Sequence, residues 1–258
     1  MFGEEEIEQM RWAKFVLENP SLTAKITNYI GKPIEKGMEL LPEGWQASIQ
    51  NATIKSLMSA LKTAIVTMDS SYDGSASPRI HKMLSALSGA AGGAFGLLAL
   101  AIELPVSTVI IFRSIADIAR SKGEDISSIE SKLSCLQVFA LGGDSKSDDA
   151  TETGYFAVRA AFARSITEAA KYIAEKGFAE EGAPVIVKFI AKIAARFEGP
   201  VAEKVIGQAV PIIGAAGGAI INTMFIDHFQ DISEGHFTIR RLERIYGEEG
   251  VKIKYDSL

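Results

Sequence analysis

The hexapeptide Gly89-Ala90-Ala91-Gly92-Gly93-Ala94 recurs unchanged as Gly214-Ala215-Ala216-Gly217-Gly218-Ala219. Each copy lies in a long uncharged run, 83–102 with 20 residues and 205–226 with 22 residues. Because apolar residues dominate both runs, we predict that each forms a helix. Glycine in a helix costs roughly 1 kcal/mol relative to alanine, so close helix packing or contact with lipid must offset that cost.

The glycines of these runs stand four residues apart, and this GxxxG spacing places a smooth groove on one helix face. Twenty apolar residues also reach the length that spans a bilayer. The charged residues Glu103, Arg113 and Asp117 follow the first run and argue against a simple span. Three arrangements stay open: a buried central hairpin, partial or conditional membrane insertion, and two constitutive spans. The candidate residues for membrane or lipid contact are Gly89, Gly93, Gly96, Gly214 and Gly218.

Helical periodicity continues through the rest of the chain, and no segment shows sustained alternation typical of a strand. We predict an all-α fold, a single domain over residues 1–258 with eight to ten helices, in which the two Gly/Ala-rich helices are central and pack closely together. Residues 1–18 should form a peripheral helix, and 144–153 a mobile loop. The other predicted helices cover 47–69, 105–121, Ser127 to Gly142, a long stretch after 153, 184–197 and a last segment through 246, with breaks at Glu103-Leu104-Pro105 and Gly199-Pro200.

Composition excludes some classes of partner. The net charge of −5 offers no basic field for a phosphate backbone, so we expect no nucleic-acid binding. Hydrophobic residues make up 47% of the chain and the mean hydropathy is +0.15, which suits close helix packing or membrane contact. The single cysteine, Cys135, cannot form an intramolecular disulfide and favours a reducing compartment. The acidic N-terminal segment does not resemble a secretory signal, so we expect a cytoplasmic protein, with a place at the inner face of the cell membrane left open.

Several ordered stretches resemble the signature of the EcsC family, and the resemblance extends from about Leu17 to Tyr246. The resemblance implies a bacterial cytoplasmic protein that associates with membranes, because the family is named for a gene beside those of an ABC transporter linked to secretion. It implies no catalytic residues. The stretches are Glu103-Leu104-Pro105-Val106-Ser107-Thr108, Arg113-Ser114-Ile115-Ala116-Asp117-Ile118-Ala119-Arg120, Cys135-Leu136-Gln137-Val138-Phe139-Ala140-Leu141-Gly142-Gly143, Pro211 to Ala219, Asn222, Asp227-His228-Phe229-Gln230, His236-Phe237 and Arg241-Leu242-Glu243.

Glu103 and Arg113 flank an uncharged run, and a carboxylate in such surroundings is costly unless it is paired. We therefore expect either a buried Glu103–Arg113 pair or a helix start at Glu103. The alternative is a functional pocket, in which Glu103, Arg113, Asn222 and His228 would be the catalytic candidates.

Asp227, His228 and His236 are weak candidates for metal ligands. On one continuous helix the two histidines would lie about 12 Å apart, so a shared site needs a break near Gly235. A role in caps and hydrogen bonds is the alternative. The sequence contains no phosphate-binding loop, no HExxH and no Gly-x-Ser-x-Gly. We expect no cofactor and a Cys135 that packs in the core.

The leading hypothesis is a non-enzymatic or peripheral membrane-associated accessory protein linked to transport or secretion, with membrane lipid and a membrane transporter as possible partners. A hydrolase-like enzyme and a lipid-binding module are the alternatives. The oligomeric state stays open.

Overall fold

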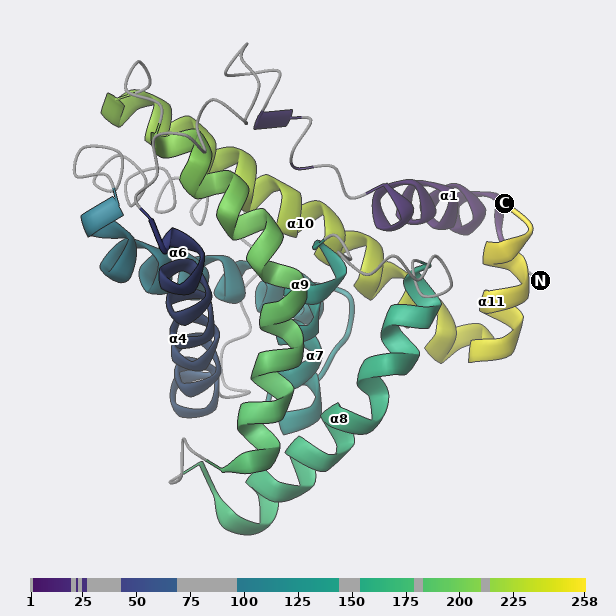
Figure 1. The fold of residues 1–258 in the computed structure, drawn as a ribbon. Coiled ribbons are helices and arrows are strands. Elements are labelled where there is room, and N and C mark those ends of the chain that lie inside the picture. The colour runs from purple at the N-terminus through teal and green to yellow at the C-terminus, as the bar shows by residue number, and fades with distance from the viewer. Residues whose placement is uncertain are drawn as a thin grey trace.

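All regular secondary structure in the described part of the chain is helical (Figure 1), so the all-α prediction is confirmed. The computed structural model describes residues 2–19, 22, 25–26, 43–68, 97–143, 154–178, 183–209 and 214–258. Its helices are α1 (Glu4–Glu18), α4 (Trp45–Thr67), α6 (Leu97–Ser121), α7 (Ile129–Leu141), α8 (Tyr155–Lys176), α9 (Pro184–Ala209), α10 (Gly214–Tyr246) and α11 (Glu248–Asp256).

The centre of the described bundle is α7, which packs against α4, α6, α8, α9 and α10. Its residues 131–141 are all buried, because neighbours surround this short helix on every side. The Ser128 side chain caps its start and accepts a hydrogen bond from the backbone N–H of Ser131 at 3.1 Å. The helix predicted from Ser127 therefore has Ser128 as its N-cap and begins at Ile129.

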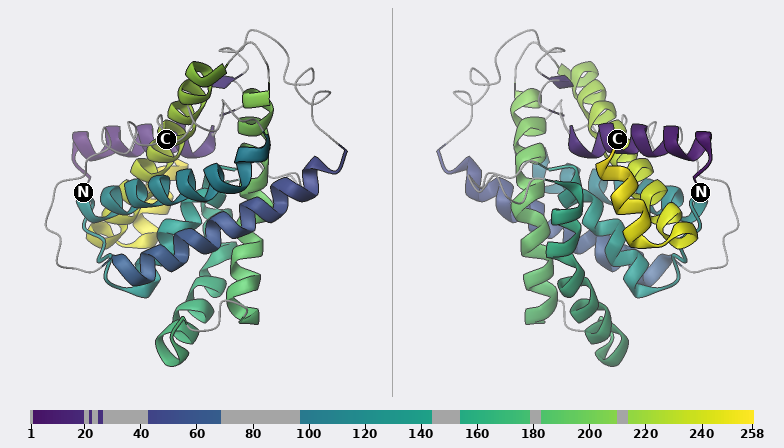
Figure 2. Two further views of the ribbon diagram at one scale, coloured as in Figure 1. Left: turned by 90° about the vertical axis from the view of Figure 1, so that its left-hand side faces the viewer. Right: turned by 90° about the vertical axis from the view of Figure 1, so that its right-hand side faces the viewer.

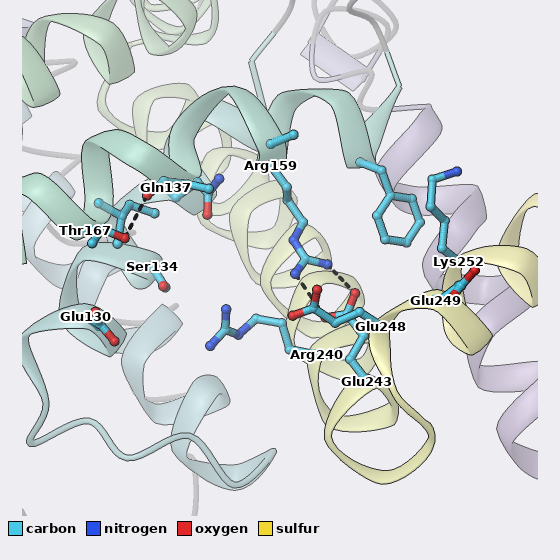
Figure 3. A pocket seen from close by; sticks show the side chains of 14 residues that line it. Glu130, Ser134, Gln137, Arg159, Thr167, Arg240, Glu243, Glu248, Glu249 and Lys252 are labelled. Atoms are coloured by element: carbon cyan, nitrogen blue, oxygen red, sulfur yellow. Dashed lines mark hydrogen bonds and ion pairs between the residues drawn. The ribbon is translucent and has the colours of Figure 1, made fainter.

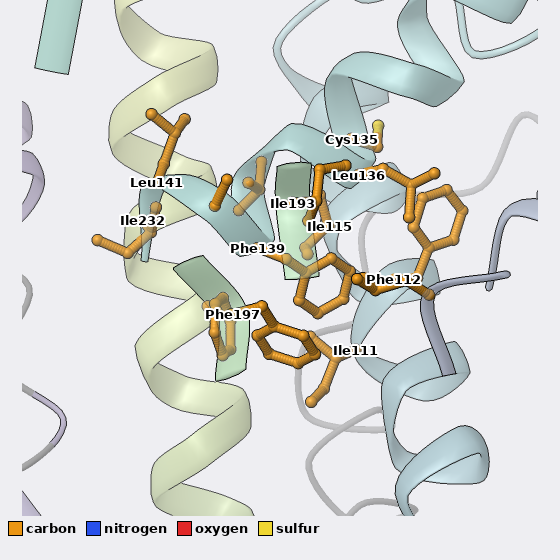
Figure 4. Packing of buried hydrophobic residues seen from close by; sticks show 14 of the residues in the cluster. Ile111, Phe112, Ile115, Cys135, Leu136, Phe139, Leu141, Ile193, Phe197 and Ile232 are labelled. Atoms are coloured by element: carbon orange, nitrogen blue, oxygen red, sulfur yellow. The ribbon is translucent and has the colours of Figure 1, made fainter. Parts of the chain in front are cut away.

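Aromatic rings fill the space between α7, α9 and α10 (Figure 4). The ring centroid of Phe197 lies 4.7 Å from that of Phe139 and 5.5 Å from that of Phe229. Phe225 extends the cluster along α10, 5.2 Å from Phe229. Tilted and edge-on contacts of this kind add to the area that the rings bury. Cys135 is buried on α7, as the sequence predicts.

Two glycines after α7 allow an unusually close approach of neighbouring helices. A Cβ on Gly142 would lie 2.6 Å from Cε1 of Phe229, and one on Gly143 would lie 2.1 Å from the backbone oxygen of Arg196. Gly142, with which the predicted helix ends, is the C-cap of α7. Its φ of −82° is accessible to any residue, so the close packing is what requires glycine there.

Two predicted helix breaks do not form. α6 runs through Pro105 and α9 runs through Pro200. Proline removes one helical hydrogen bond, but the turns on both sides of each proline are held by tertiary contacts. Glu103 is bound from α9, whereas Phe197 and Val201 are buried in the core beside Pro200.

α10 joins the second Gly/Ala motif to the last predicted helix without interruption for 33 residues. The break near Gly235 that a shared site of His228 and His236 would need does not occur. A Cβ there would lie 2.9 Å from Cγ2 of Val16, so Gly235 lets α1 approach α10. The second uncharged run is thus divided between the end of α9 and the start of α10. No helix in the described residues is both long and apolar enough to cross a bilayer.

The N-terminal helix α1 packs against α10 and α11 at one end of the molecule (Figure 2). Arg241 donates a hydrogen bond to Gln9 at 2.6 Å, and the Tyr246 hydroxyl donates one to Glu6 at 2.7 Å. Lys14 donates to the backbone oxygen of Tyr255 at 2.9 Å. These contacts join residues that are more than 230 positions apart in the chain.

Candidate functional site

Glu103 lies in a buried polar cluster that joins three helices. Lys204 on α9 donates hydrogen bonds to both carboxylate oxygens of Glu103 on α6, at 2.9 and 3.1 Å. The same ammonium donates to Oγ of Ser107 at 3.0 Å, and Asn222 on α10 donates to Oε1 of Glu103 at 2.9 Å. Glu103 and Asn222 are candidates predicted from the sequence, whereas Lys204 was not predicted.

The cluster compensates its own charges. The side chains of Lys204 and Glu103 are 0% and 5% exposed, and burying either charge alone would be costly. All three N–H groups of the ammonium have an oxygen acceptor, and its nitrogen lies 5.0 Å from the centre of the Phe225 ring. This buried ion pair fixes α6, α9 and α10 to one another.

The other two catalytic candidates lie elsewhere. Arg113 is exposed on α6 and donates to the hydroxyl of Thr67 on α4 at 2.9 Å. The buried ring of His228 bonds through Nε2 to the backbone oxygen of Gly142 at 2.7 Å. Burial lowers the pKa of His228 to about 4. The expected Glu103–Arg113 pair is wrong, because the lysine from α9 reaches Glu103 while Arg113 faces outward.

The weak metal candidates do not converge either. His236 is fully buried, and its Nδ1 lies 2.9 Å from the Tyr155 hydroxyl. His228 bonds instead to Gly142, the C-cap of α7. Among the described residues, no three His, Cys, Asp or Glu side chains are grouped so that they could hold a metal ion.

The glycines proposed for membrane or lipid contact are only partly described. Gly89, Gly93 and Gly96 lie outside the described residues. Gly214 is the first residue of α10, and Gly218 is buried one turn later. The close packing of the two Gly/Ala motifs therefore stays a prediction. The loop predicted at 144–153 also lies outside the described residues.

Away from the buried cluster, a pocket of about 640 Å³ opens between α7, α8, α10 and α11 (Figure 3). At its centre Arg159 forms two hydrogen bonds with Glu243, at 2.7 and 2.9 Å. Arg240 projects into the same space from α10 and forms two bonds with Glu124, both 2.9 Å. Burial alone would raise the pKa of Glu124, but the bonds from Arg240 and Arg244 lower it below its usual value.

α7 contributes a polar stripe to this pocket. Glu130, Ser134 and Gln137 follow at helical spacing and line one wall. The pocket was not predicted from the sequence, because its residues come from four helices and match no motif. One signal was visible: Gln137 is an amide inside the apolar run Cys135 to Leu141.

Comparison with known proteins identifies one family. The model of the EcsC protein family matches residues 5–242 of the 258. No curated protein and no solved structure matches the chain.

Proposed function

The chain belongs to the EcsC protein family, and we propose that it works as a peripheral membrane protein, an accessory to transport or secretion without an enzymatic activity of its own. The observation that carries this proposal is an exposed apolar stripe on α6. The stripe begins where the first uncharged run ends.

The stripe consists of Ile102 and Val106, which lie one turn apart on the same face of α6, and Val109 continues this face where it packs against the core. Ile102 is 74% exposed and Val106 is 47% exposed, and Val109 is partly buried. Single exposed apolar residues are common, but these three continue directly from the uncharged run 83–102. An apolar surface of this kind is typical of contact with a membrane or a partner.

Charge favours an apolar mode of membrane contact. The net charge of −5 gives no general attraction to anionic lipid. Arg113 follows at the end of the stripe and is exposed, so its long side chain could reach lipid headgroups while the apolar residues enter the interface. Below the stripe, the Glu103–Lys204 pair fixes α6 to α9, so the surface would be presented by a rigid helix.

The enzymatic alternative has less support. Glu103, Arg113, Asn222 and His228 do not share a pocket, and the two that touch each other are engaged in the buried ion pair. The family resemblance supports a membrane transporter as the protein partner and the inner face of the cell membrane as the location.

Vesicle flotation of the purified protein tests the proposal, with neutral and with anionic vesicles. We expect the wild-type protein to float with both compositions, because the contact is apolar. The double variant Ile102→Glu/Val106→Glu should stay at the bottom. The control is Ile253→Glu, which places a charge at another exposed apolar residue, 65% exposed on α11, and should float like the wild type. Flotation of the double variant at the wild-type level, or no flotation of the wild type, would overturn the proposal.

A further inference from the structure

The outer face of α1 carries the only exposed aromatic side chains in the part of the chain that the structure describes. Trp12 is 43% exposed and Phe15 is 66% exposed, whereas the other described aromatic rings are at least partly buried. Because the two residues are three positions apart, their side chains are neighbours on the helix surface. A single exposed apolar residue needs no explanation, but two adjacent aromatic rings are typical of a surface that another molecule covers.

The opposite face of α1 is fixed to the rest of the molecule. Met10 and Leu17 are buried on it, and Arg241 on α10 donates a hydrogen bond to Gln9 at 2.6 Å. Figure 1 shows α1 at the edge of the bundle, docked beside α10 and α11. The aromatic pair is therefore presented by a docked helix, and we expect substitutions on its outer face to leave the fold intact.

Carboxylates lie on the same face of α1 as the aromatic pair. Glu4, Glu5 and Glu8 are exposed there, at spacings that keep them on one side of the helix. The only cation on this face is Arg11, which forms an ion pair with Glu8 at 2.6 Å. Three carboxylates against one guanidinium leave two negative charges in excess.

The start of α11 extends this acidic surface. The ring centroid of Tyr246 lies 4.4 Å from that of Phe2, which places the turn between α10 and α11 beside the start of α1. Glu248 and Glu249 follow that turn directly and are exposed. Carboxylates of two helices therefore meet at this end of the molecule.

We propose that the outer face of α1 binds a basic amphipathic helix of a partner protein. The apolar side of that helix covers Trp12 and Phe15, and its Lys and Arg side chains meet the carboxylates of α1 and α11. Aromatic residues at the centre of a contact often supply much of its binding energy, and opposite charges around them select the partner.

Charge favours this partner over a lipid surface or a second copy of the chain. Helices that lie in a membrane interface usually carry Lys and Arg on their polar face, whereas this face has an excess of negative charge that anionic lipid repels. In a pair of identical faces, like charges would oppose each other. The face shares no residue with the α6 stripe, so the proposal stands or fails independently of membrane binding through α6.

The fluorescence of Trp12 tests the proposal. The chain has two tryptophans, so the variant Trp45→Phe leaves Trp12 as the only one. The probe is a peptide of about 14 residues, long enough to begin forming a helix, with Leu on one face and Lys on the other. We expect this Leu/Lys peptide to shift the emission of Trp12 to the blue, because the ring leaves water. A peptide with Glu in place of Lys should cause no shift, and oligolysine, which has no apolar face, should bind at least about tenfold more weakly.

Variants in the same background locate the contact. Phe15→Ala should weaken binding of the Leu/Lys peptide at least about tenfold, and Glu5→Gln/Glu8→Gln should weaken it about tenfold by removing two charges. The matched control is Glu168→Gln/Glu175→Gln, which removes two ion-paired carboxylates of α8 and should bind only slightly more weakly than the parent. Unfolding midpoints establish that each variant is folded.

Several results would overturn the proposal. They are no blue shift with the Leu/Lys peptide, an equal shift with the Leu/Glu peptide, and unchanged affinity in a folded Phe15→Ala. The same blue shift with phosphatidylcholine vesicles would assign the face to lipid instead. A dimer in sedimentation velocity that Phe15→Ala abolishes would assign it to a second copy of the chain.

Discussion

Replacing Lys204 with methionine tests whether the buried ion pair holds α6, α9 and α10 together. The change removes two hydrogen bonds to Glu103 and one to Ser107, and leaves Glu103 with the bond from Asn222. Breaking a buried pair costs about 3–5 kcal/mol, because one charge stays buried without compensation. Methionine fills most of the volume of lysine, and Asn222 still donates a hydrogen bond to Glu103. We therefore expect the free energy of unfolding to fall by about 3 kcal/mol, the lower end of this range. In a domain of this size that is a fall in Tm of roughly 6–12 °C.

Urea unfolding followed by far-UV circular dichroism measures the effect. Lys188→Met is the control, because Lys188 is exposed on the same helix, and it should change stability by less than about 0.5 kcal/mol. The double variant Glu103→Leu/Lys204→Met should recover most of the loss, since replacing both charges by apolar groups is often neutral. A cost below about 1 kcal/mol for Lys204→Met, or a double variant no more stable than the single one, would refute the reasoning.

Three further predictions concern buried positions. Gly143→Ala should destabilise the protein by about 1–3 kcal/mol or more, because its Cβ would lie 2.1 Å from the Arg196 oxygen, whereas Gly154→Ala meets nothing within 4 Å and should be near neutral in the same urea titration. The pKa of His228 is about 4 in the folded protein and about 6.5 in the unfolded chain. As the pH is lowered from 6.5 to 4, the unfolded chain therefore takes up the proton first, and the free energy of unfolding should fall by roughly 3 kcal/mol. His228→Gln should reduce that pH slope in urea midpoints, and an unchanged slope would contradict it. Burial raises the pKa of the Cys135 thiol, so a disulfide reagent should label it far more slowly in native protein than in urea, and rapid native labelling would show that it is accessible.

Most of the described helices could be predicted from the sequence, because apolar periodicity depends on local spacing, but α11 was not predicted. α4 and α7 begin and end within two residues of the predicted bounds, and α1 ends at the predicted residue but begins three residues later than predicted. The predicted breaks at Pro105 and Pro200 failed for a nonlocal reason. Proline weakens a helix locally, but contacts from other helices hold both segments, and no local pattern reveals such contacts.

The candidate site was predicted only in part. Glu103 and Asn222 could be selected because polar groups in apolar runs must find partners. Lys204 could not be assigned to Glu103, since it is 101 positions away and stands in an ordinary charged segment, Glu203-Lys204. The residues that line the pocket come from four helices, so no local pattern predicts it. The one signal in the sequence is Gln137, a polar residue inside an apolar run. Gly142 and Gly143 resemble simple helix ends, although their lack of a side chain serves close packing.

The packing of α1 against α10 and α11 limits the order in which the helices can fold. The hydrogen bond between Arg241 and Gln9 cannot form until Arg241 has been synthesised, 232 positions after Gln9. At about 5–20 residues per second, the ribosome needs roughly 10–50 s to cover that distance. During that time the face of α1 that bears Met10, Ala13 and Leu17 has no partner to cover it. The contact between α1 and α10 can therefore form only long after α1 has been synthesised, and in that interval a nascent chain offers the apolar face of α1 to chaperones.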